Sequence, residues 1–309
     1  MRIIRLDIHT TRYYDTPMCA CIGYFDGMHL GHKALVDKTI QLAEKYQCES
    51  ALITFEPDPW VAIKGMHKVQ HITTMKERIN RAVSLGIQNI IILEFTAEMS
   101  HLSPDDFINH ILNHLNLKAL VCGFDFHYGY MGAGDAMSLK ERGGIDVHVV
   151  DAINDDEGKI SSTRITKAIE SGDMISAYHM LGYFFSIEGK VIHGRRQGTG
   201  IGFPTANLEY SDEYIQPKGG VYAGFALIDT KRYRCMINYG HNPTFNYRKK
   251  MSLEANIFNY SGDLYGKTIR LEFVKYIRAE VKFKNRNNLI MQLEQDTQKC
   301  NQILPEYER

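Results

Sequence analysis

Residues 23–32, with the sequence GYFDGMHLGH, decide the fold of the first half of the chain. An apolar run from Met18 to Ile22 precedes them, and Lys33 to Lys45 follows with apolar residues at helical spacing. The pattern predicts a strand, a glycine-rich turn and the start of a helix. Glycine lets the backbone approach a ligand closely, and the free N–H groups of a helix start favour phosphate. We therefore predict that this turn binds a nucleotide.

Two histidines, His29 and His32, stand three residues apart in the turn. On its own, such a pair is more often a solvated helix start or half of a metal site. A zinc site needs further Cys or His ligands to complete its coordination. The strand–turn–helix setting favours nucleotide binding over both of these alternatives.

Length, charge and cysteine content narrow the class of protein. The 309 residues are enough for about two domains. The formal net charge is zero, so no bulk field favours nucleic acid or an acidic membrane. The N-terminus lacks a signal-peptide pattern, and no apolar run reaches the roughly 18 residues of a membrane span. We expect a cytoplasmic protein without disulfides, nucleic-acid or membrane partners, or an obligate protein partner.

Short apolar runs alternate with helical patterns through the rest of the first half. Such alternation is typical of a parallel α/β sheet, whose ligands bind at the carboxyl ends of the strands. Two helices, 162–170 and 174–181, then lead to Gly182, and we predict a first domain over residues 1–182. The predicted strands are 51–55, 90–93, 119–122 and 147–150, with helices at 75–85 and after Ser103.

The pattern changes at Tyr183 to short alternating strands separated by glycine-rich turns. It predicts an all-β second domain over residues 183–309, a small Greek-key-type barrel. A helix over 286–302 closes the chain. The predicted strands are 186–192, 220–227, 233–237, 253–258 and 268–276.

Two runs in the second half are similar to riboflavin kinase motifs: GFPTAN at 202–207 and NYGHNPTF at 238–245. In the first half, the turn at 23–32, the loop GFDFHYG at 123–129 and SSTRI at 161–165 resemble motifs of bacterial FAD synthetases. Those enzymes belong to the nucleotidyltransferase superfamily. The likeness covers almost the whole chain, which therefore resembles a bifunctional riboflavin kinase/FAD synthetase.

The resemblance implies a Rossmann-like nucleotidyltransferase sheet followed by the barrel. It also implies two reactions: ATP phosphorylates riboflavin to FMN, and ATP then adenylylates FMN to FAD with release of pyrophosphate. In the kinase half, Thr205 and Asn207 would hold Mg²⁺, an ion that takes oxygen ligands. Glu254 would be the general base, its alternative being an ordinary exposed strand residue. The remaining kinase residues implied are Gly200 and Gly202 for ATP, and Asn238 and Arg278 for flavin.

In the FAD synthetase half, the resemblance implies that His29 and His32 donate hydrogen bonds to phosphate. Asp125 and Phe126 would contact flavin, although an aromatic loop more often serves packing. The hydroxyls before the helix at 162–170 have a simpler alternative role as its N-cap. The residues implied for ATP and pyrophosphate are Gly23, Phe25, Gly31, Lys159, Ser162, Thr163 and Arg164.

Four positions depart from the family pattern: Tyr24 replaces Asn, Asp58 replaces His, Thr166 replaces Arg, and Thr199 replaces Arg. Three of them fall in the FAD synthetase half, which leaves open a riboflavin kinase with a weak or altered nucleotidyltransferase. A flavin-binding regulatory protein is the other alternative. The sequence keeps the implied metal ligands, Thr205 and Asn207, and the implied base, Glu254. Flavin binding alone needs none of these residues, so their presence favours an enzyme over a regulatory protein.

Overall fold

The structure, a computed structural model, describes residues 1–66, 69–193, 203–241 and 251–308. The chain forms two compact units, Met1–Ser162 and Thr163–Arg309. Nearly all of the two helices before Gly182 belongs to the second unit, and the domain boundary at 182 stays a prediction.

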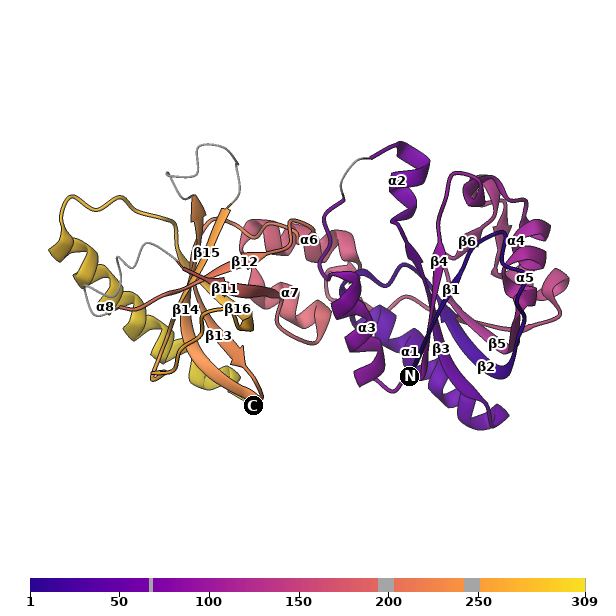
Figure 1. The fold of residues 1–309 in the computed structure, drawn as a ribbon, viewed down its shortest axis with the longest axis horizontal. Helices are drawn as coiled ribbons and strands as arrows, with labels where there is room; N and C mark the ends of the chain where they lie inside the picture. The colour runs from indigo at the N-terminus through magenta and orange to yellow at the C-terminus, as the bar shows by residue number, and fades with distance from the viewer. Residues whose placement is uncertain (67–68, 194–202, 242–250, 309) are drawn as a thin grey trace. The chain divides into compact units, whose positions relative to one another are not determined.

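A parallel sheet of six strands forms the centre of the first unit, with the order β1-β4-β3-β2-β5-β8 (Figure 1). It confirms the predicted α/β class. Strand β2 lies inside the sheet, so its carboxyl end and the turn after it meet the ends of neighbouring strands. The strands are β1 (Arg2–Leu6), β2 (Tyr14–Ile22), β3 (Glu49–Glu56), β4 (Asn89–Glu94), β5 (Leu115–Gly123) and β8 (Asp146–Val150).

Helices cover both faces of this sheet because its strands are apolar on both sides. On one face, Leu35 and Val36 of α1 and Ala82 of α3 join a buried cluster with strand residues. On the other, Phe107 of α4 and Leu139 of α5 join a second cluster. The helices are α1 (Leu30–Tyr46), α2 (Pro59–Lys64), α3 (Met75–Ser84), α4 (Pro104–His110) and α5 (Ala136–Gly143).

Two short hairpins complete the first unit near the sheet's carboxyl edge. One pairs β6 (His127–Tyr128) with β7 (Gly134–Asp135), and the other pairs β9 (Asn154–Asp155) with β10 (Gly158–Lys159). A single 3₁₀ turn, η1 (Asp26–Met28), lies between β2 and α1.

The second unit contains a closed antiparallel barrel with the order β11-β12-β15-β14-β13-β16. Strand β12 lies beside β15, the last of three strands joined in succession, which is the Greek-key order. Both findings confirm the predicted barrel. Its strands are β11 (Ser186–Ile192), β12 (Ala206–Tyr210), β13 (Gly220–Ile228), β14 (Lys231–His241), β15 (Met251–Ile257) and β16 (Thr268–Arg278).

Three helices accompany the barrel: α6 (Ser162–Ser171), α7 (Met174–Leu181) and the closing α8 (Arg286–Ile303). Tyr178 of α7 stacks on Phe184 with ring centroids 4.4 Å apart. Phe184 belongs to a buried cluster that also contains Cys300 of α8 and Val221 of β13. Helix α7 therefore packs on the core of the second unit.

Candidate active sites

The turn between β2 and α1 has an unusual backbone. Phe25 adopts the left-handed region with φ 59° although it is a buried aromatic residue. Such a conformation is costly for a non-glycine residue and persists only where surrounding contacts hold it. Gly23 N–H donates to the Ile53 carbonyl at 3.1 Å, and a Cβ at Gly31 would lie 3.0 Å from the His29 ring. Gly31 thus permits a close approach of the α1 backbone to the His29 ring.

The structure brings the two predicted histidines together. Their rings stack with centroids 3.7 Å apart, and His29 Nδ1 accepts the His32 backbone N–H at 3.3 Å, which caps α1. Burial, and then the Lys159 charge, lowers the pKa of His29 to about 4. Burial also lowers the pKa of His32 well below its usual value. Both imidazoles are neutral at pH 7, so His29 carries its proton on Nε2 and can donate it to an anion.

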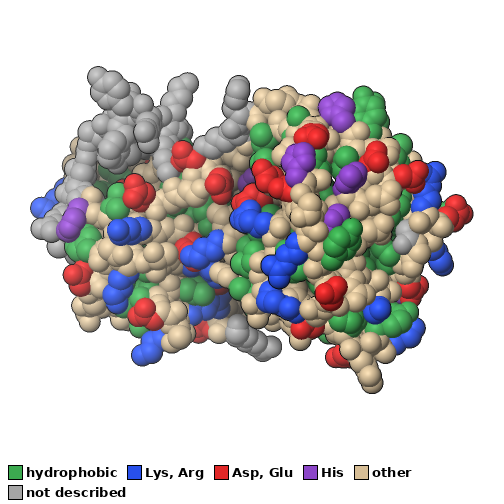
Figure 2. Space-filling model, turned by 45° about the vertical axis from the view of Figure 1, so that its right-hand side comes forward, with side chains coloured by type: hydrophobic (Ala, Val, Ile, Leu, Met, Phe, Trp, Pro, Cys, Tyr) green, Lys and Arg blue, Asp and Glu red, His purple; other side chains and the backbone are tan. Residues whose placement is uncertain are grey.

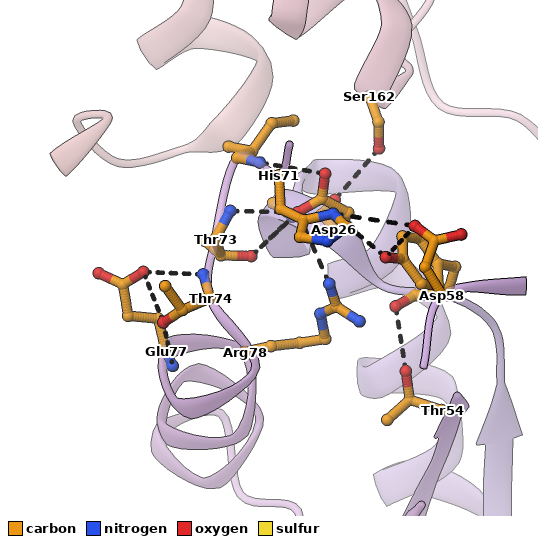
Figure 3. Close-up of polar contacts among 12 residues, drawn as sticks. Asp26, Thr54, Asp58, His71, Thr73, Thr74, Glu77, Arg78 and Ser162 are labelled. Carbon is orange, nitrogen blue, oxygen red and sulfur yellow. Dashed lines mark hydrogen bonds and ion pairs between the residues drawn. The ribbon is translucent and has the colours of Figure 1, made fainter. Parts of the chain in front are cut away.

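Asp26 ties three distant segments to the turn (Figure 3). Its carboxylate accepts the backbone N–H groups of Ile72 and Thr73, each at 3.1 Å. Its carbonyl accepts the Ser162 hydroxyl at 3.1 Å. Arg78 of α3 lies 3.8 Å from the same carboxylate. Asp26 is 6% exposed, and its role in holding the turn was not predicted.

Ser162 therefore contacts the turn between β2 and α1 through a hydrogen bond, and its role toward pyrophosphate stays a prediction. Lys159 donates to Asp125 at 2.5 Å and lies 4.5 Å from the centroid of the exposed Phe124 ring. Phe126 instead packs on the sheet core and stacks on Tyr128. The flavin role of Phe126 stays a prediction, and the exposed aromatic of this loop is Phe124. Thr163 and Arg164 follow Ser162 in α6, and their roles also stay predictions.

Four of the predicted kinase residues occupy one cross-strand row of the barrel. In the strand registers, Glu254 of β15 pairs with Asn207 of β12 on one side and Asn238 of β14 on the other. Val221 of β13 then connects Asn238 to Arg278 of β16. Residues paired across strands share a face of the sheet. The neighbours of Glu254 along β15 are fully buried, so the row lies on the opposite face from them.

Glu254 is half-buried, and its electrostatic surroundings disfavour a charge. Burial raises the pKa of its carboxyl, and the charge of Glu280 raises it further. A side chain at Gly240 would collide with the Glu280 carboxylate, so the glycine leaves room for it. A carboxylate with a raised pKa accepts a proton more readily than an ordinary one, as a general base requires.

Arg278 is held by the closing helix. Its guanidinium donates to both carboxylate oxygens of Asp296 in α8: Nη2 lies 2.6 Å and Nε 2.9 Å from Oδ2, and Nε lies 3.1 Å from Oδ1. Asp296 is fully buried and also accepts the Gln292 amide at 3.0 Å. The pairing fixes the direction of Arg278, and sequence reasoning missed Asp296. No motif marks Asp296, because its pairing with Arg278 is a tertiary contact between α8 and β16.

Thr205 is exposed and lines a pocket of about 140 Å³ at the start of β12. Leu264, Tyr265 and Asp263 line its other side. The hydroxyl of Thr205 and the amide oxygen of Asn207 are oxygen donors of the kind that Mg²⁺ prefers, so the two predicted ligands fit that ion. Gly200 and Gly202, the predicted ATP glycines, lie outside the described residues.

The surface seen in Figure 2 carries Lys and Arg side chains interspersed with Asp and Glu, in keeping with the zero formal net charge. Across the residues with described positions, no helix is both long and apolar enough to span a membrane. Within the same part of the chain, no three or more His, Cys, Asp or Glu side chains are grouped to hold a metal ion.

Comparison with known proteins places two family models on the chain. FAD synthetase matches residues 12–164, and riboflavin kinase matches residues 181–304. A bifunctional riboflavin kinase/FMN adenylyltransferase of Listeria monocytogenes is 34% identical over 94% of both chains. This chain belongs to the bifunctional riboflavin kinase/FMN adenylyltransferase family. Members from Bacillus subtilis and Escherichia coli are 36% and 30% identical over 90% and 96% of both chains.

A solved structure has the same fold as this chain. It comes from Streptococcus pneumoniae, is described as a macrolide-efflux protein, and is 31% identical with a TM-score of 0.89. The match covers 96% of this chain and 99% of the other. The likeness extends over both units.

Two of the departures from the family pattern contact each other. The Tyr24 hydroxyl donates to Asp58 Oδ2 at 2.5 Å and lies 3.1 Å from Nδ1 of His71. Burial and the bond to Asp58 raise the pKa of Tyr24, so the phenol keeps its proton. Asp58 uses its other oxygen to cap α2 through the Trp60 N–H at 2.7 Å. The two replacements thus form a matched pair at the carboxyl edge of the sheet.

We expect Tyr24→Phe and Asp58→Ala to be non-additive in unfolding free energy. Each single change leaves a partner at this half-buried site without its hydrogen bond, which costs about 1–3 kcal/mol. The double variant should cost less than the sum, with a coupling of about 1 kcal/mol or more. Chemical denaturation of the four proteins measures this. Strict additivity would show that the bond contributes nothing to stability.

Proposed function

We propose that this chain converts riboflavin to FMN and FMN to FAD, with ATP as the second substrate of both reactions. Family membership supports the pair of activities, and the site geometry supports the residues. The observation that carries the kinase assignment is the row that joins Asn207, Glu254 and Asn238. Side chains from three strands converge there although 47 positions separate the first residue from Glu254 in the sequence.

In the kinase reaction, the riboflavin 5′-hydroxyl attacks the γ-phosphorus of ATP, and ADP leaves. Glu254 accepts the hydroxyl proton as the new P–O bond forms. Thr205 and Asn207 would hold Mg²⁺, which supplies neutralisation of phosphate charge when bound. Asn238 and Arg278 would contact the flavin, with Arg278 directed by Asp296. The pocket beside Thr205 would receive part of ATP.

In the adenylylation reaction, a phosphate oxygen of FMN attacks the α-phosphorus of ATP, and pyrophosphate leaves. The neutral imidazoles of His29 and His32 donate hydrogen bonds to phosphate oxygens, without a covalent intermediate. Preorganised donors of this kind stabilise charge that shifts in the transition state. Ser162, Thr163, Lys159 and Arg164 would hold the departing pyrophosphate, and Asp125 would contact the flavin.

Incubation of the full-length chain with riboflavin, ATP and Mg²⁺ tests both activities when FMN and FAD are separated over time. We expect FMN to form first and FAD to follow, under oxidised or reduced flavin. Formation of FMN without FAD would support the kinase activity and contradict the adenylyltransferase activity. Tight flavin binding with neither product would favour the flavin-binding regulatory alternative.

We propose that the two activities lie in separable parts, 1–182 and 183–309, and expect the helices before Gly182 to stabilise the kinase part. A fragment 163–309 keeps the stacking of Tyr178 on Phe184, whereas 183–309 exposes Phe184. Burial of such a side chain contributes about 1.5–3 kcal/mol. The longer fragment should melt at least about 5 °C higher, and both should phosphorylate riboflavin. Equal melting temperatures would mean that α7 does not belong to the folded core of this part.

A further inference from the structure

The first unit buries an arginine that the proposed reaction does not use. Arg78 of α3 is 2% exposed. Its guanidinium carbon lies 4.5 Å from the centroid of the Tyr24 ring, a cation–π contact. Tyr24 is itself held by Asp58 and His71. Figure 3 shows the guanidinium directed toward Asp26 and His71. The arginine is thus fixed beside the turn between β2 and α1.

The ion pair with Asp26 leaves most donors of Arg78 unused. The separation of 3.8 Å from Nη2 to Oδ1 is too long for a hydrogen bond. The Asp26 carboxylate already accepts two backbone N–H groups, of Ile72 and Thr73. Among the described residues, Nε and Nη1 of Arg78 are buried atoms without a hydrogen-bond partner. A buried guanidinium without acceptors is unfavourable, so these donors call for an acceptor from outside the chain.

The phosphate-binding turn lacks a cation of its own, because both of its imidazoles are neutral at pH 7. His32 Nδ1 is a further buried atom without a partner in the described structure. Arg78 contacts the turn through the Tyr24 ring and the Asp26 carboxylate, and its charge contributes to the lowered pKa of His32. Lys159, the other cation that acts on His32, is 43% exposed and paired with Asp125. Arg78 therefore supplies the buried positive charge at this turn.

We propose that Arg78 binds a phosphate group of the adenylyl-transfer substrates at the turn beside His32. The inference rests on the proposed function, which it deepens with a residue outside the predicted motifs. A guanidinium suits phosphate because its planar donors match phosphate oxygens and its charge persists at all accessible pH values. The Tyr24 ring and the Asp26 carboxylate hold it in position before the anion arrives, which lowers the cost of binding.

The test is calorimetric titration of the full-length chain with inorganic pyrophosphate, and separately with FMN, combined with steady-state kinetics. Arg78→Gln should weaken binding of the phosphate ligand that it contacts by about 10- to 100-fold, the range for hydrogen bonds to charged groups. The Michaelis constant of that substrate in FAD formation should rise by a similar factor. Riboflavin phosphorylation by the same protein should not change. The two ligands identify which phosphate Arg78 holds.

Arg142→Gln is the matched control. It removes an arginine of the same unit that pairs with Asp105 at 3.0 Å on the exposed surface. Surface pairs contribute little, so its ligand affinities should equal those of the wild type. Wild-type affinity of Arg78→Gln for both ligands would overturn the inference. A wild type that binds pyrophosphate but forms no FAD would instead refute the proposed reaction and leave the Arg78 site standing.

Arg78 also lies against Asp26, so Arg78→Gln can fail to fold for structural reasons. Arg78→Lys keeps the charge and removes the planar donors. It therefore separates a structural role of Arg78 from a role in ligand binding. We expect it to melt near the wild type and to bind the phosphate ligand about 3- to 10-fold more weakly, less than one charged hydrogen bond. A purely structural role would lower the melting temperature of Arg78→Lys and leave its ligand affinity and Michaelis constants unchanged. That result would overturn the inference.

Discussion

Glu254→Gln is expected to reduce riboflavin phosphorylation by about 10²- to 10⁴-fold, the usual contribution of a general base. The amide cannot accept the hydroxyl proton, although it keeps the shape of the side chain and its position between Asn207 and Asn238. The loss should appear in kcat more than in KM, because proton transfer belongs to the transition state. Initial rates of FMN formation measure it. A loss below about threefold would make Glu254 a structural residue, since its expected contribution begins near 10².

The pH dependence gives a second measurement of the same residue. Because the base must be deprotonated, kinase activity should rise as pH passes the pKa of Glu254, which lies above that of an ordinary carboxyl. Glu280→Gln removes a negative charge that raises this pKa, so the acid limb should move to lower pH. Glu209→Gln, on the exposed part of β12, is the control and should leave the limb where it was. An unmoved limb in Glu280→Gln would exclude Glu254 as the titrating group.

His29→Ala is expected to lower FAD formation by about 10²- to 10³-fold, or roughly 3–4 kcal/mol, and to leave FMN formation intact. The change removes a neutral donor, Nε2–H, aimed at phosphate oxygens whose charge shifts as pyrophosphate leaves. His32→Ala should behave similarly, since its ring stacks on His29. Rates of FAD formation from FMN and ATP measure both variants. Riboflavin phosphorylation in the same samples shows whether the chain is folded.

His29→Asn separates chemistry from capping. His29 also caps α1 through Nδ1, and loss of a cap costs about 0.5–2 kcal/mol of stability. Asparagine is a good N-cap residue, so His29→Asn should melt close to the wild type and still lose FAD formation. Recovery of activity in His29→Asn would mean that the cap, and not the imidazole donor, is what the reaction needs.

Long periodic segments could be predicted from the sequence, while several short strands, β12 among them, could not. The predicted helix over 75–85 is α3 (Met75–Ser84), and Ser103 caps α4 as expected. Strand β12 (Ala206–Tyr210) was missed because it is short and begins inside the GFPTAN run. Its pairing with β15 is what brings Asn207 to Glu254.

The residues that organise the sites were harder to predict than the residues in the motifs. Asp26, Arg78 and Asp296 act through tertiary contacts, and nothing in their local sequence indicates a partner 18 to 136 positions away. Tyr24 and Asp58 looked like two independent departures from a pattern. Only the fold shows that they form one hydrogen-bonded pair. The spacing of residues along the chain predicts helices and strands. Which residues pair with a buried charge depends on how the strands and helices are arranged in the fold.

The contacts of Asp26 have a consequence for the order in which the protein folds. They join the turn to residues 46 and 136 positions further along the chain. Closing loops of that length costs chain entropy before any contact is gained, so non-local contacts form late in folding. A nascent chain that lacks residue 162 cannot complete the turn, even with most of its sheet assembled. We therefore expect a chain that ends before residue 162 to lack the nucleotide affinity proposed for this turn.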